Sequence, residues 1–90
     1  MVSTDEELKQ LNQEVVQLYQ KEEYLEAIDV GIQALKLGEN TLGPKHPDTA
    51  SALNNLAVLY DKVGDHARAK PLHQWKQQLF ADKTWETQTV

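Results

Sequence analysis

The chain of 90 residues contains no cysteine, so disulfides cannot support its fold and thiolate metal sites are excluded. Nor does any stretch approach the 18 apolar residues of a membrane-spanning helix. Residues 1–7 carry neither a basic segment nor an apolar run, and therefore do not resemble a signal peptide. Because the lack of cysteine fits a reducing compartment, we expect a cytoplasmic protein with no membrane partner.

Glycine and proline are also scarce, with 4 and 3 residues, and two of each fall between residues 38 and 47. This stretch is the main break in the chain. Strict alternation of apolar and polar residues, which would indicate strands, appears nowhere over a useful length. The sequence therefore predicts an all-α fold.

Basic residues are few in the first half of the chain. Residues 1–44 hold nine acidic and three basic side chains, a net charge of −6, whereas residues 45–90 carry +1. An acidic half argues against a nucleic-acid partner, which needs clustered lysine and arginine. It permits a basic peptide as partner, although a simple solvated helix face explains the same charges.

Signals of catalysis and of metal binding are absent. There is no phosphate-binding glycine loop, nucleophile elbow or His-Glu metal motif. His66 and His73 stand seven residues apart, about 10 Å along a helix, which is too far for one ion, and His46 lies in a loop. We expect neither an enzyme nor a metal or other cofactor.

Four helices are predicted from capping signals and apolar periodicity. Ser3 with Glu6, or Thr4 with Glu7, has capping-box spacing before the first apolar stripe. A second stripe starts at Tyr24, and Pro47 suits the first position of the third helix. The fourth helix is expected from about His66 to about Lys83, with a tail, residues 84–90, that frays.

The chain repeats itself at an offset of 42 residues. This offset pairs Leu11 with Leu53 and Ala27 with Ala69, and each unit reads as helix, turn, helix. We therefore divide the single domain into repeat one (about 5–40), a linker (38–47) and repeat two (about 47–83). A single helical hairpin cannot bury its apolar face, so such units stack on one another.

The second unit carries a recognisable motif. Leu53, Leu56, Ala57 and Tyr60, followed by Gly64 and Ala69, resemble the tetratricopeptide repeat (TPR). The 42-residue period, and the segment from Leu42 to Ala50 followed by Leu53 to Ala57, are similar to the kinesin-light-chain subclass. This resemblance implies a short α-solenoid that acts as a protein-interaction scaffold.

The sequence departs from that family at two positions of the fourth helix. The family usually has an aromatic residue where this chain has His73, and a small residue where it has Lys76. A long charged side chain does not suit a tight helix crossing. We therefore expect the last helix to pack differently, as at the end of a repeat array.

The resemblance also implies a binding groove, since the first helix of each hairpin lines the concave face of such solenoids. Asn and Gln side chains both donate and accept hydrogen bonds, so they can hold an extended peptide, although they can equally just solvate an open face. Lys9 and Asn55 suggest a less favoured alternative, a clamp for a partner's terminal carboxylate. The predicted peptide-binding residues are Lys9, Asn12, Gln13, Val16, Tyr19, Ser51, Asn54, Asn55, Val58, Asp61 and Lys62.

A second hypothesis concerns the last helix, where Leu72, Trp75 and Leu79 form an apolar stripe beside Phe80. Because two repeats are fewer than usual, this stripe is a candidate surface for a homo-oligomer. Alternatively, the tail folds back so that Trp85 covers the stripe in a monomer. Peptide binding and self-assembly are compatible, since a dimer would lengthen the groove.

Overall fold

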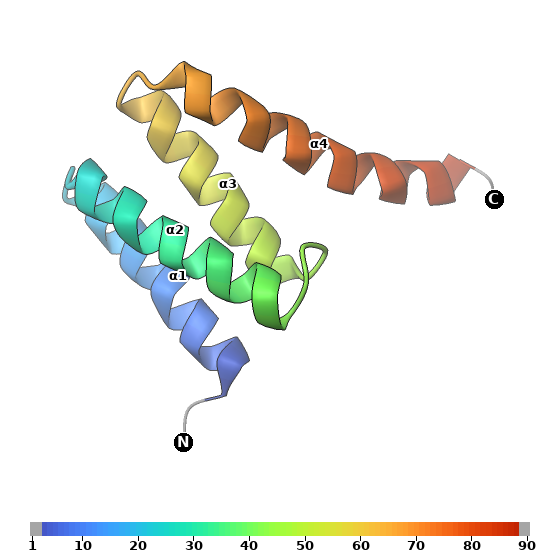
Figure 1. Cartoon of the computed structure of the whole chain (residues 1–90), viewed down its shortest axis with the longest axis horizontal. Helices are drawn as coiled ribbons and strands as arrows, with labels where there is room; N and C mark the ends of the chain where they lie inside the picture. The colour runs from blue at the N-terminus through green and yellow to red at the C-terminus, as the bar shows by residue number, and fades with distance from the viewer. Residues whose placement is uncertain (1–2, 89–90) are drawn as a thin grey trace.

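Four consecutive helices make up the described part of the chain, which covers the backbone of residues 3–88 and the side chains of residues 3–79 in a computed structural model. They are α1 (Thr4–Gln20), α2 (Tyr24–Thr41), α3 (Pro47–Lys62) and α4 (His66–Gln88). Consecutive helices pack against each other, and α3 also contacts α1 (Figure 1). The predicted all-α solenoid of two hairpins is confirmed.

Side chains just before three of the helices fix where they begin. Ser3 accepts a hydrogen bond from the Glu6 N–H at 3.2 Å, which selects the first of the two capping boxes allowed by the sequence. Asp65 accepts one from the Arg68 N–H at 3.2 Å. The cap of α3, which the sequence did not suggest, is His46, whose Nδ1 accepts from the Asp48 N–H at 3.1 Å.

The core lies where α1, α2 and α3 meet, with Ala69 of α4 at its edge. It is built from aliphatic residues that recur at helical spacing, as the sequence predicts. Its buried hydrophobic residues are Leu8, Val15, Ala27, Ile28, Ala34, Leu35, Ala52, Leu53, Leu56, Ala57, Leu59 and Ala69.

Gly38 lies inside α2 and not in the linker, where the density of glycine and proline had placed it. The loop between the hairpins is shorter than predicted and covers residues 42–46. A Cβ atom at Gly38 would stand 3.0 Å from both Cβ and Cγ2 of the buried Thr49, and closer still to its hydroxyl. The glycine is therefore needed for the close approach of α2 to α3.

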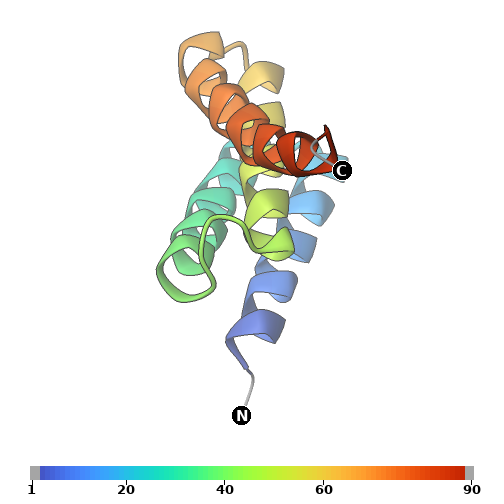
Figure 2. The same ribbon diagram turned by 90° about the vertical axis from the view of Figure 1, so that its right-hand side faces the viewer.

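The last helix is longer than expected. Its backbone is helical to Gln88, five residues beyond the predicted end at Lys83, because no glycine or proline follows Pro71 to interrupt it. Among the described helices, α4 packs only against α3. Its C-terminal end therefore points away from the rest of the molecule in Figure 1, and lies in front of the other helices, toward the viewer, in Figure 2.

Replacement of Gly38 by alanine tests the α2–α3 contact. We expect Gly38→Ala to lower the free energy of unfolding by about 1–3 kcal/mol, because overpacking against Thr49 outweighs the better helix propensity of alanine. The measurement is the urea midpoint followed by circular dichroism.

Gly31→Ala is the matched control in the same helix. A Cβ there would lie 3.3 Å from Leu56 Cδ1, the end of a flexible side chain, so the cost should be smaller. Thr49→Ala should restore part of the stability lost in Gly38→Ala. Equal costs at both glycines would contradict this account of the contact.

Candidate functional site

A groove lies between α1 and α3. Eight residues line its wider part, which has a volume of about 520 Å³. Most are uncharged and polar, and the two charges, Lys9 and Asp48, are of opposite sign. The lining residues are Lys9, Asn12, Gln13, Val16, Gln17, Asp48, Ser51 and Asn55.

A smaller apolar pocket adjoins this part, and we name it the valine pocket. It has a volume of about 290 Å³ and shares Val16 and Asn55 with the wider part. Val16 and Val58 stand at equivalent positions, 42 residues apart, and are 44% and 38% exposed although they are large and apolar. The pocket is lined by Val15, Val16, Tyr19, Asn54, Asn55, Val58 and Leu59.

Nine of the eleven predicted groove residues thus line one of the two parts. Gln17 and Asp48 also line the wider part and were missed, as were Val15 and Leu59 in the valine pocket. Gln17 stands one turn after Gln13, and Asp48 one turn before Ser51, so each shares a helix face with a residue that was predicted.

Asn12 joins the two hairpins as well as lining the groove. Its Nδ2 donates to the backbone carbonyl of Asp48 in the first turn of α3, at 3.0 Å. Its Oδ1 is buried and has no hydrogen-bond partner within the described residues. Asn12 therefore holds α3 against α1.

Asp61 and Lys62 line neither part, although both were predicted to do so. Asp61 is held by two histidines of α4: Oδ1 lies 3.0 Å from His66 Nδ1, and Oδ2 lies 2.6 Å from His73 Nε2. Lys62 instead places its Nζ 5.9 Å from the centre of the Tyr24 ring.

Asn54 has a contact that the sequence did not reveal. It lines the valine pocket, and its Oδ1 accepts a hydrogen bond from Lys76 Nζ at 2.5 Å. Its neighbour Asn55 is instead shared by both parts of the groove.

The contact with His73, and secondly the one with His66, holds the pKa of Asp61 below its ordinary value of 3.8. The anionic carboxylate therefore links α3 to the start and middle of α4. His66 and His73, seven residues apart, reach one carboxylate through its two different oxygens. No group of residues able to hold a metal ion occurs in the described part of the chain.

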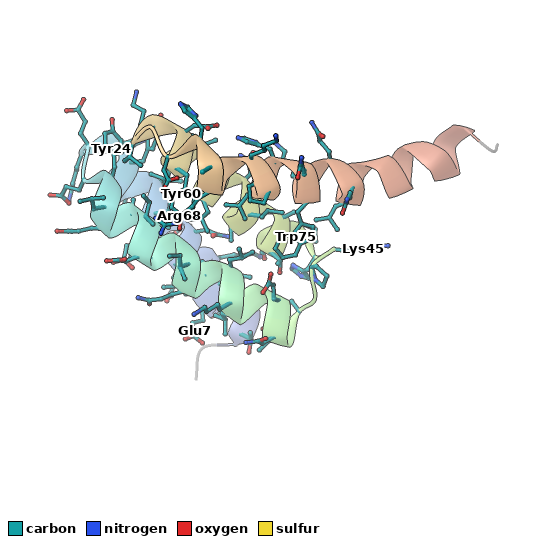
Figure 3. The ribbon with its side chains drawn as sticks, turned by 45° about the horizontal axis from the view of Figure 1, so that its top comes forward. Glu7, Tyr24, Lys45, Tyr60, Arg68 and Trp75 are labelled. Atoms are coloured by element: carbon teal, nitrogen blue, oxygen red, sulfur yellow. The ribbon has the colours of Figure 1, made fainter. Side chains whose placement is uncertain are left out.

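The apolar stripe of α4 is partly buried. Leu72, Trp75 and Leu79 pack against the core, and Trp75 lies on the side of α4 turned toward the other helices (Figure 3). The side chains of Phe80 and Trp85, named in the self-association and tail hypotheses, lie outside the described residues. Within the described residues, none of the helices has the length and apolar character needed to cross a membrane.

Two comparisons with known proteins bear on the chain. Residues 11–75 match the sequence model of a family described as tetratricopeptide repeat. A search among curated proteins gave no match. The matched segment contains both helices that line the groove, apart from the first turns of α1.

The lowered pKa of Asp61 predicts a pH-dependent contribution to stability. Since the folded pKa is below the unfolded one, ionised Asp61 stabilises the fold above about pH 4, and this contribution is lost as the pH falls through the folded pKa. We expect wild type to unfold at higher urea than Asp61→Asn at neutral pH, and the difference to vanish in acid.

A double-mutant cycle provides the control. His73→Ala should lower the urea midpoint in wild type and have less effect in the Asp61→Asn background. If the two substitutions are additive at neutral pH, the Asp61–His73 contact does not contribute to stability.

Proposed function

Because this chain belongs to the tetratricopeptide-repeat family, we propose that it is an interaction module that binds an extended segment of another protein in the groove between α1 and α3. Repeats of this family generally mediate protein–protein interactions, and the family is a non-catalytic scaffold. The proposal commits to a binding site, and no catalytic residue is part of it.

The wide part of the groove suits the main chain of an extended peptide. Side-chain amides supply both donors and acceptors, which is what successive peptide N–H and C=O groups require. Gln13 and Gln17 offer them from α1, and Asn55 offers one from α3. Asn55 stands at the junction with the valine pocket, so one amide contacts the ligand at the point where the polar part becomes apolar.

The valine pocket suits an apolar side chain of the same peptide. Val16 and Val58 remain exposed in the free chain, and covering them with a ligand side chain would remove apolar surface from water. Their meeting in one pocket beside Asn55 is the observation that carries the proposal. Scattered exposed valines would need no explanation, whereas two equivalent ones facing the same hollow favour a binding site.

The charge of the first hairpin favours a basic partner segment. The net charge of −6 on residues 1–44 would attract such a segment at long range and raise its association rate. The nearly balanced charges of Lys9 and Asp48 in the groove leave the contact itself to hydrogen bonds and apolar burial.

Self-assembly through α4 is the second hypothesis from the sequence. It does not enter the proposal, because the partial burial of Leu72, Trp75 and Leu79 leaves less apolar surface on α4 than the sequence suggested. The resemblance to the kinesin-light-chain subclass concerns the type of repeat and names no partner. The carboxylate clamp has little support, since Lys9 is the one basic residue that lines the groove within the described part of the chain.

Peptides selected from a display library against the chain, and measured by fluorescence anisotropy, test the site. We expect Asn55→Ala to weaken binding about tenfold, the effect of losing about 1.4 kcal/mol of hydrogen bonding. Val58→Asp should abolish binding of peptides with an apolar anchor residue.

Asn40→Ala is the matched control, since Asn40 is an exposed amide on α2 outside the groove. It should bind as wild type does, and all three variants should keep the wild-type circular dichroism. Selected peptides that bind Asn55→Ala and Val58→Asp with wild-type affinity would place the binding site elsewhere on the molecule.

A further inference from the structure

The first hairpin shows how this chain stacks one repeat on the next. Small buried residues of α2, namely Ala27, Gly31, Ala34 and Gly38, form a seam at helical spacing. A Cβ at Gly31 would lie 3.3 Å from Leu56 Cδ1, and one at Gly38 would press on Thr49, so the seam admits α3 only because its residues are small.

The 42-residue offset locates the corresponding face of the second hairpin. Gly31 corresponds to His73, and Ala34 corresponds to Lys76. Gly38 corresponds to Phe80, whose side chain lies outside the described residues. The face that would receive a third hairpin therefore carries an imidazole and a lysine where the stacking face of α2 has almost no side chain.

Both of these side chains are bound by α3. His73 Nε2 lies 2.6 Å from Asp61 Oδ2, and Lys76 Nζ donates to Asn54 Oδ1 at 2.5 Å. Asn54 is the counterpart of Asn12, which in the first hairpin bonds to the backbone of α3 instead. The side chains of His73 and Lys76 are thus hydrogen-bonded within the chain, on the face of α4 where a following hairpin would pack.

The opposite end face, on α1, lacks the apolar residues that stacking on another hairpin would need. The side of α3 that packs on α2 is buried and mostly apolar: Thr49, Ala52, Leu56 and Leu59 are each at most 3% exposed. Their counterparts on α1, at the same offset, are all polar and exposed. These counterparts are Glu7, Gln10, Glu14 and Gln17.

We infer that both end faces of the two-hairpin unit are closed to stacking, so that a second copy of the chain does not extend the solenoid. If α1 of a second copy packed on α4 as α3 packs on α2, the side chain of Glu14 would clash with that of His73. The charged groups of Glu14 and Lys76 would also be buried, at a high desolvation cost. The Asp61–His73 and Asn54–Lys76 pairs take the place of a third repeat on the face of α4. This inference does not rest on the peptide-binding proposal.

One rival reading uses the same residues. A head-to-tail contact would bring Glu14 of one copy toward His73 and Lys76 of the next, and opposite charges attract. Sterics decide against it. A Cβ added at Gly31, the counterpart of His73, would already lie 3.3 Å from Leu56 Cδ1, so stacking with this geometry leaves no room for an imidazole. The rival makes a distinct prediction, namely association that weakens with salt.

Mass measurement by light scattering behind a sizing column tests the inference. Wild type should keep the monomer mass of 10.2 kDa at all concentrations. Two variants are then designed to make one end face each able to stack. One makes α4 resemble α2 (His73→Gly, Lys76→Ala, Phe80→Gly), and the other makes α1 resemble α3 (Glu7→Thr, Gln10→Ala, Glu14→Leu, Gln17→Leu).

Mixing the two variants should give a 1:1 complex of twice the monomer mass, and mixing either with wild type should not. If circular dichroism shows that the glycine-containing variant is unfolded, alanine at residues 73, 76 and 80 keeps the opened seam with a better helix propensity. Two outcomes would overturn the inference: a wild-type dimer that dissociates with salt or with Glu14→Gln, or folded variants that fail to associate.

Discussion

The close approach of α2 to α3 is the contact on which the rest of the structure depends. It requires small residues on α2, namely Gly31 next to Leu56 and Gly38 next to Thr49. Since α2 packs against both α1 and α3, the distance between α2 and α3 also affects the distance between α1 and α3. That distance is what opens a groove there, bridged by the hydrogen bond from Asn12 to the Asp48 carbonyl.

The two hairpins have the same plan but different roles, and the difference lies in a few side chains. The seam of α2 is small and therefore stacks, whereas the same line on α4 carries His73 and Lys76 and turns toward α3 for its hydrogen bonds. A short solenoid has most of its residues near an end, so its solubility depends on such substitutions. The groove between α1 and α3 keeps Gln13, Gln17 and Asn55 in its lining, together with the exposed Val16 and Val58.

Much of the fold was predictable because helix signals are local. The capping residue Ser3, the apolar stripes and Pro47 at the first turn of α3 fall where the structure has them. Gly38 was misplaced because a glycine near prolines indicates a break equally well whether it ends a helix or admits a neighbouring one. The cap at His46 was missed because histidine is not among the residues usually found there.

The sequence by itself determined which helices form and which face of each one carries the amides, because both follow from spacing along a single helix. Only the tertiary structure decided which of those polar groups are free to bind. Asn54 and Asn55 are neighbours in the same pattern, yet Lys76 reaches one and not the other. That outcome depends on how α4 crosses α3, which brings together residues 22 positions apart and leaves no periodic trace in the sequence.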